Sequence, residues 1–171
     1  QQDGKWKGKS GPIRSSDILM GETYDATRDP GEWCRPGFDD SRWTPVEEYR
    51  SHAGALAAYP ANPVRQTEEL PARSLHQDPG GAWIFDFGQN FSGVVQLSLH
   101  GKRGQKIVIR HGEMLHADGS LMTENLRKAR AVDTYICCGS AEGEEWTPRF
   151  TYHGFRYAEV SGLHAEPPLS T

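Results

Sequence analysis

The chain has 171 residues, of which 36% are hydrophobic and 25% are charged, as expected for a soluble globular protein. It contains no run of about 18 apolar residues, which excludes a membrane-spanning helix. The formal net charge of -4 argues against a nucleic-acid partner, since such partners usually require a basic face. The three cysteines lack regular spacing and do not indicate a disulfide framework.

The first 60 residues predict a loop-rich segment. Glycine and proline recur throughout it, and only Asp17–Met20 and Glu22–Asp25 offer short extended pieces. Asp39–Trp43 predicts a turn with a tryptophan anchor, because Asp and Ser side chains bond to nearby backbone amides. This segment has too little periodic structure to bury its own aromatic residues. We expect it to be the tail of an upstream β domain, or a wrap packed on the next domain.

Residues 61–80 predict an extended connector, because four prolines in and beside it exclude a helix of useful length. Val64–Leu70 alternates between polar and apolar residues and predicts a first strand. Ser74–His76 predicts a second, weaker one.

From Trp83 onwards the pattern predicts antiparallel strands separated by glycine-containing turns. Asp118–Gly119 predicts a hairpin with a type I′ turn, and Leu121–Lys128 predicts a single helical turn. The predicted strands are residues 83–87, 94–99, 106–111, 132–138, 147–152 and 155–160. The fold class is therefore all-β, an antiparallel and jelly-roll-like β-sandwich over residues 61–165. Residues 166–171 predict a linker or a frayed end.

Three phrases in the β region carry a resemblance: Phe85–Asn90, Thr123–Arg127 and Tyr152–Tyr157. Together with Gly21–Ala26 and Pro36–Trp43, they resemble the accessory β region that precedes the catalytic barrel of bacterial α-L-rhamnosidases. The resemblance implies that the first 60 residues end one accessory β domain, most of which lies upstream. It implies that a second accessory sandwich follows nearly whole. In this family, an (α/α)6 barrel carries the general acid and general base of an inverting reaction.

The resemblance implies a non-catalytic domain of an enzyme that hydrolyses terminal α-L-rhamnosyl residues. We expect it to support the catalytic barrel, to contact a rhamnose-containing glycoside and to hold no catalytic residue. The alternative is a stand-alone rhamnose-binding module or lectin, and self-association is a further alternative for a truncated piece. We expect neither a nucleic-acid nor a membrane partner, and no cofactor, although calcium is a candidate for the upstream domain of the parent. No signal peptide is visible, so we expect the bacterial cytoplasm rather than secretion.

Four polar residues within these phrases are the candidates for contact with carbohydrate or with the barrel: Asn125, Arg127, His153 and Arg156. The alternative is that they brace loops. In that reading Asn125 caps a turn, and Arg156 pairs with a carboxylate such as Glu159 or Asp133.

Other polar residues predict no site of their own. We expect the run Glu142, Glu144 and Glu145 to form a solvated turn, and Glu113 to face solvent or a salt bridge. His111 and His116 are expected on the surface or in turns, because a metal site needs three or four converging ligands.

Aromatic side chains offer flat faces on which a sugar could stack. The alternative, which we favour, is packing in the core or between domains. The residues concerned are Trp33, Trp43, Trp83, Trp146, Tyr152 and Tyr157.

Overall fold

The computed structural model describes residues 6–47, 54, 55 and 57–169. Parts of the predicted segment 1–60, and the last two residues of the predicted linker, lie outside the described residues. None of the helices in the described part of the chain has the length and apolar character needed to cross a lipid bilayer. The chain divides into two compact units, Gln1–Gly11 with Pro30–Thr67, and Pro12–Asp29 with Glu68–Thr171.

In the described part of the first unit, a short strand pair and a cluster of aromatic rings hold the chain together. Strand β1 (Lys7–Gly8) pairs antiparallel with β4 (Thr44–Pro45). The Asp39 carboxylate accepts the Ser41 N–H at 2.9 Å, and the Trp43 ring packs edge-on against Phe38 at 5.7 Å. The predicted turn with a tryptophan anchor is therefore confirmed.

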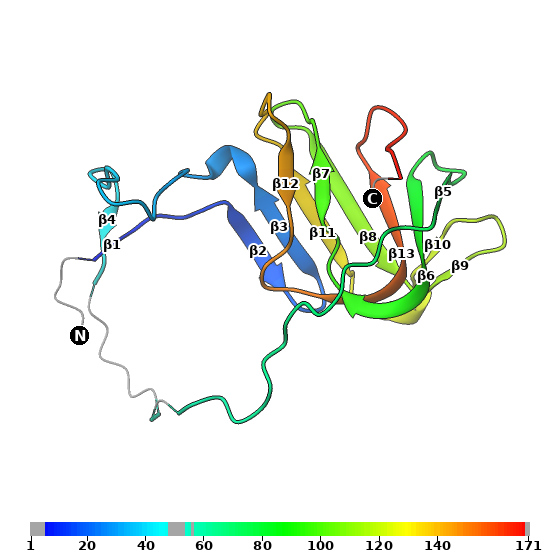
Figure 1. Ribbon diagram of the computed structural model, residues 1–171, viewed down its shortest axis with the longest axis horizontal. Helices are drawn as coiled ribbons and strands as arrows, with labels where there is room; N and C mark the ends of the chain where they lie inside the picture. The colour runs from blue at the N-terminus through cyan, green and yellow to red at the C-terminus, as the bar shows by residue number, and fades with distance from the viewer. Residues whose placement is uncertain (1–5, 48–53, 56, 170–171) are drawn as a thin grey trace. The chain divides into compact units, whose positions relative to one another are not determined.

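The second unit is built on a seven-stranded sheet with the order β2-β3-β11-β8-β13-β6-β5 (Figure 1). Neighbouring strands are antiparallel except β3 and β11, which run parallel, so the sheet is mixed rather than purely antiparallel. The strands are β2 (Ile13–Asp17), β3 (Gly21–Asp25), β5 (Ser74–Gln77), β6 (Trp83–Gly93), β8 (Lys106–Gly112), β11 (Val132–Ile136) and β13 (His153–Ser161).

A second layer covers the apolar face of this sheet. Strands β7 (Leu97–Leu99) and β12 (Glu144–Trp146) pair with each other, and Leu97 and Trp146 belong to the buried core cluster. Alternation along β8 buries Ile107 and Ile109 on the same face, because successive side chains of a strand point to opposite sides. The all-β class and the two-layer architecture of the prediction are confirmed.

The predicted hairpin at Asp118–Gly119 joins β9 (Met114–Leu115) to β10 (Leu121–Met122). Its turn differs from the predicted type I′, because only Gly119, with a φ of 86°, is left-handed there. The Gly119 N–H donates to the His116 carbonyl at 3.0 Å. This pattern fits a type I turn followed by a left-handed glycine.

Three of the predicted extended segments are wrong. Val64–Leu70 has no strand pairing. Residues 147–152 do not form a strand either, because the N–H groups of Arg149 and Phe150 donate to the Glu22 carboxylate instead. Residues 18–20 form a turn, because the carboxylate of Asp17 accepts the N–H groups of Leu19 and Met20. The predicted helical turn is confirmed as η2 (Glu124–Leu126), and a second 3-10 turn, η1, spans Ala26–Arg28.

Candidate functional site

An ion pair joins the first and third phrases of the sequence. Asp86 lies on β6 opposite Tyr157 of β13, and Arg156 is the preceding residue, at the point where the strand pairing shifts register. The guanidinium binds both carboxylate oxygens at 2.8 Å, and the Gly88 N–H donates to the same carboxylate at 2.6 Å. The hydrogen bond from Arg156 is the main reason that the pKa of Asp86 lies below its usual value. The expectation that Arg156 pairs with a carboxylate is confirmed, but the partner is Asp86 rather than Glu159 or Asp133.

A second polar contact joins the first and second phrases. We call Asn90, Glu113 and Asn125 the amide–carboxylate cluster. The Glu113 carboxylate accepts the Asn90 Nδ2 at 2.8 Å and the Asn125 Nδ2 at 3.2 Å. All three side chains are exposed. Asn125 does not cap η2, whose first turn has no side-chain cap, so the predicted capping role is wrong.

Arg127 follows directly after η2 and has an unusual backbone. Its φ of 59° and ψ of -105° are rare for a residue with a side chain, and such conformations cost of order 1–3 kcal/mol. The side chain is exposed. Asn125 and Arg127 therefore present polar groups at one exposed bend.

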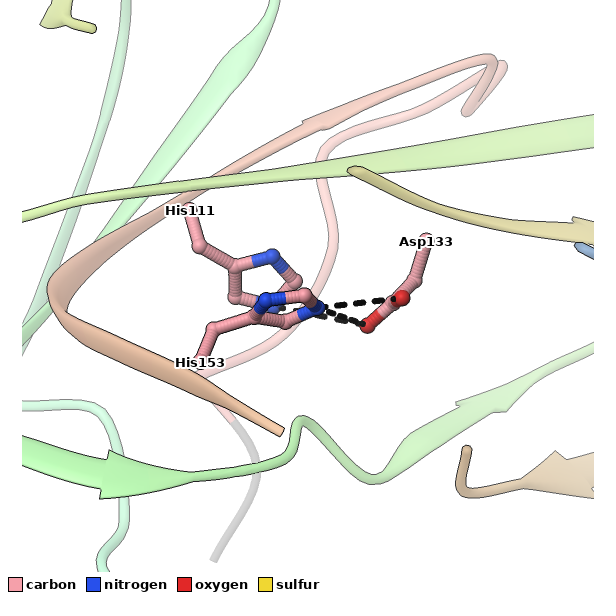
Figure 2. Close-up of side chains that lie close together, drawn as sticks. All are labelled: His111, Asp133 and His153. Atoms are coloured by element: carbon pink, nitrogen blue, oxygen red, sulfur yellow. Dashed lines mark hydrogen bonds and ion pairs between the residues drawn. The ribbon is translucent and has the colours of Figure 1, made fainter. Parts of the chain in front are cut away.

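The fourth candidate, His153, is buried and belongs to a different group of residues. Its Nε2 lies 3.2 Å from both carboxylate oxygens of Asp133, and its ring centroid lies 4.3 Å from that of His111 with the two rings tilted by 30° (Figure 2). His111 and Asp133 have no exposed surface, and His153 is 4% exposed. We call these three residues the buried triad. The expectation that the histidines lie on the surface or in turns is wrong for His111.

The strand order explains why the buried triad forms. His111 lies on the central strand β8, and β11 and β13, which carry Asp133 and His153, are its two neighbours in the sheet. The register places Asp133 opposite Ile109, so its side chain shares the core-facing side of the sheet. The triad therefore forms the polar end of the apolar core.

Hydrogen bonding fixes the protonation pattern of His111. Its Nδ1 lies 2.9 Å from the Ala131 carbonyl, which can only accept, so Nδ1 carries the proton. Burial, followed by the nearby His153, lowers the pKa of His111 to about 4, and the ring is neutral at pH 7. Among the described residues, its Nε2 finds no hydrogen-bond partner, and it lies 3.8 Å from the Asp133 carboxylate.

Two buried glutamates, Glu22 and Glu144, stabilise the second unit through hydrogen bonds. The sequence pattern did not predict this structural role. Glu22 is fully buried and accepts the N–H groups of Arg149 and Phe150 at 3.1–3.3 Å. Glu144 accepts the Tyr135 hydroxyl at 2.8 Å and the N–H of Cys138 at 2.7 Å. The expectation of a solvated turn is therefore wrong for Glu144.

The hydrogen bonds to the Glu144 carboxylate predict that the fold loses stability in acid. Burial alone would raise the pKa of Glu144, but the hydrogen bonds from Cys138, Tyr135 and Gly139 outweigh it and hold the pKa below the usual 4.5. A carboxyl with a lowered folded-state pKa stabilises the fold above about pH 4.5, and this contribution is lost as the pH falls further. We expect Glu144→Gln to destabilise the chain by about 1–3 kcal/mol at pH 7, and to flatten the pH dependence of urea unfolding below 4.5.

The control for this measurement is Glu145→Gln, because Glu145 is the exposed next residue of β12. It should leave both the stability and its pH dependence within about 0.5 kcal/mol of the unsubstituted chain. Equal pH profiles for the two variants would contradict the role given to Glu144.

The aromatic residues divide between core and surface. Trp146 is buried beside Tyr135, at a ring distance of 5.3 Å, and belongs to the core as expected. Trp33 is 56% exposed and lies with Trp43 on an open cavity of about 400 Å³ in the first unit. Lys7, Arg35 and Asp40 add charged groups to that cavity.

The chain matches the models of two known protein domains. The model of the bacterial α-L-rhamnosidase concanavalin-like domain matches residues 76–171, more than half of the chain. The model of the α-L-rhamnosidase N-terminal domain matches residues 1–68. This chain belongs to the α-L-rhamnosidase family. The family predicted from the three phrases is confirmed, as is the restriction of the resemblance to the accessory β region.

Individual α-L-rhamnosidases are similar over nearly all of this chain. The α-L-rhamnosidase of Streptomyces avermitilis is 44% identical over 167 residues, which is 97% of this chain and 16% of that protein. One from Formosa agariphila is 39% identical and covers 95% of this chain and 18% of its own length. The chain therefore spans less than a fifth of these relatives.

Solved structures agree with the sequence comparison. The crystal structure of the Streptomyces avermitilis α-L-rhamnosidase complexed with L-rhamnose matches with a TM-score of 0.92 at 42% identity, over 97% of this chain and 16% of that one. The Aspergillus terreus α-L-rhamnosidase matches with a TM-score of 0.89 at 36% identity, over 98% of this chain and 19% of that one. This chain corresponds to the N-terminal and β-sandwich regions of these enzymes.

Proposed function

We propose that this chain is the accessory β region of an α-L-rhamnosidase whose catalytic barrel lies elsewhere in the polypeptide. The observation that carries the proposal is the TM-score of 0.92 to a rhamnosidase of which the chain covers only 16%. In this proposal, the parent hydrolyses terminal α-L-rhamnosyl residues, and residues 61–165 position its barrel. Residues 1–60 are the tail of the preceding accessory domain, and their strands β2 and β3 complete the sheet of the second unit.

The buried carboxylates support a non-catalytic role. An inverting glycosidase needs one carboxylic acid with a raised pKa and a second carboxylate about 6.5–9.5 Å away across a water. Glu22 and Glu144 instead accept backbone N–H groups, and Glu159 is bound by Arg110 at 2.8 and 3.1 Å. Carboxylates held in this way are occupied by structural hydrogen bonds and stabilise the sandwich.

The amide–carboxylate cluster and Arg127 are the surface that we assign to the barrel or to carbohydrate. Their amide, carboxylate and guanidinium groups are exposed, and such groups form hydrogen bonds with sugar hydroxyls or with polar side chains of a partner domain. Arg156 contributes by fixing β6 against β13 through Asp86. His153 is buried, so any part it plays in this surface is indirect. In this proposal the hydrolysis itself uses no cofactor, and calcium is a candidate only for the upstream domain of the parent.

The proposal is tested first on the 171-residue chain, with p-nitrophenyl α-L-rhamnoside as substrate and titration calorimetry with L-rhamnose, both with and without calcium. We expect no hydrolysis. Hydrolysis that resists further purification would overturn the proposal. Rhamnose binding without hydrolysis would instead favour a stand-alone binding module.

The second test places Glu113→Ala in a longer α-L-rhamnosidase polypeptide that contains this region. Because Glu113 is exposed, we expect stability to change by less than about 1 kcal/mol. We expect a lower kcat/KM, since the two amides lose their shared acceptor. Glu145→Ala on the exposed side of β12 is the matched control, and equal kcat/KM values for the two variants would contradict the surface assignment.

A further inference from the structure

The buried triad gathers three metal-ligating side chains at one point. The ligand atoms of His111, Asp133 and His153 all lie within 4.8 Å of one another (Figure 2). The three residues come from neighbouring strands of the sheet: backbone pairing sets β11 against β8, and His153 lies on β13 just before its paired stretch with β8 and opposite Gly93 of β6. A buried carboxylate beside two imidazoles is costly to keep in an apolar core without a compensating charge.

Hydrogen bonds outside the triad aim its ligand atoms inward. The Ala131 carbonyl accepts both the backbone N–H of His111 at 3.0 Å and the Nδ1–H at 2.9 Å, which leaves the Nε2 lone pair facing Asp133. The Glu22 N–H donates to the Asp133 carboxylate at 2.8 Å. Metal-binding histidines and carboxylates are oriented in this way by carbonyl and amide groups around the site.

The two separations from the Asp133 carboxylate are close to those between neighbouring ligands of a small transition-metal ion. Nitrogen and oxygen ligands lie about 2.0–2.2 Å from zinc, so two ligands of a tetrahedral ion are about 3.3 Å apart. The Nε2 atoms of His153 and His111 lie 3.2 and 3.8 Å from the Asp133 carboxylate. Among the described residues, the Nε2 of His111 has no hydrogen-bond partner. A metal ion would give this atom a partner.

We propose that His111, Asp133 and His153 form a structural binding site for one divalent transition-metal ion, for which Zn²⁺ is the best match. Two imidazoles and one carboxylate suit zinc, whereas calcium requires six to eight oxygen ligands. The bound ion neutralises the buried carboxylate and joins β8, β11 and β13 at the polar end of the core. The site is buried, so its role is in stability rather than in catalysis.

The test uses the 171-residue chain, purified in chelator, dialysed and titrated with Co²⁺ and then Zn²⁺. We expect one Co²⁺ per chain, with visible ligand-field bands and no thiolate-to-cobalt charge-transfer band, because the site has no cysteine ligand. Zn²⁺ should abolish these bands and raise the melting temperature. A chain that binds neither ion at one equivalent, or that binds through cysteine, overturns the proposal and leaves the triad as a hydrogen-bonded network.

Variants separate this site from surface binding. His153→Gln and His111→Gln should each weaken Co²⁺ binding by more than about 100-fold, since loss of even an outer-shell partner costs about 10–100-fold. The control is His116→Gln, which removes the exposed pair of His116 with Glu124 at 3.3 Å. Each variant is first checked for the circular dichroism of the folded chain. If either triad variant is folded and binds Co²⁺ as the unsubstituted chain does, the proposal is wrong.

Discussion

The Asp133→Ala variant is expected to lose about 3–5 kcal/mol of unfolding free energy, because it leaves buried polar groups without their charged partner. Asp133 is fully buried and accepts the Glu22 N–H at 2.8 Å and the His153 ring at 3.2 Å. A domain of this size is stabilised by only about 5–15 kcal/mol in total. The variant should therefore unfold at a much lower urea concentration, measured by tryptophan fluorescence in the presence of a chelator.

The control for Asp133→Ala is a chemically similar aspartate on the surface. Asp118 also accepts a backbone N–H, that of Ser120 at 3.0 Å, but it is exposed in the hairpin turn. Asp118→Ala should cost less than about 1 kcal/mol, since water replaces the lost partner. Similar losses in the two variants would show that burial of Asp133 does not set its contribution.

The Gly21→Ala variant is expected to destabilise the second unit by more than about 3 kcal/mol. Gly21 opens β3 with a φ of 100°, a conformation that side chains disfavour. A Cβ there would overlap the carbonyl oxygen of Val132 and lie 2.6 Å from its carbonyl carbon. Because that backbone belongs to β11, the parallel pairing of β3 with β11 would have to shift. Urea unfolding measures the loss.

Gly154→Ala on β13 is the matched control. Gly154 has a φ outside the left-handed region, and nothing lies within 4 Å of the Cβ that alanine would add. We expect this substitution to be neutral or to stabilise the chain by about 0.4–1 kcal/mol, because it restricts the unfolded chain. A loss as large as that of Gly21→Ala would mean that any side chain is harmful in these strands, and the clash with Val132 would not be the cause.

Alternation and turn chemistry were enough to predict much of the second unit. Strands β8 and β13 follow from alternating apolar residues, and the hairpin before β10 follows from Asp118–Gly119. Residues 147–152 were predicted wrongly because their backbone N–H groups bond to Glu22, which is 127 residues away from Arg149 in the sequence. A local pattern carries no information about such a distant partner.

For the candidate site residues too, the sequence predicted the segments but not the long-range contacts. The sequence phrases marked segments that the fold brings together, but they did not show which residues of these segments would bind each other. The candidates in these phrases are Asn125, Arg127, His153 and Arg156. Asp86 became the partner of Arg156 only because β6 pairs with β13 across a register shift. Glu144 and Glu145 are adjacent in the sequence, yet one is buried and the other exposed, because strand geometry points them to opposite faces.

The sequence by itself determined the all-β class, most of the strands and the α-L-rhamnosidase family, because these depend on local alternation, turn residues and phrases that can be read in order. Only the tertiary structure decided that β3 joins β11 in parallel and that His111, Asp133 and His153 meet. Those contacts depend on which strands become neighbours in the sheet. Strand order is set by burial of the shared apolar face, to which distant segments contribute together.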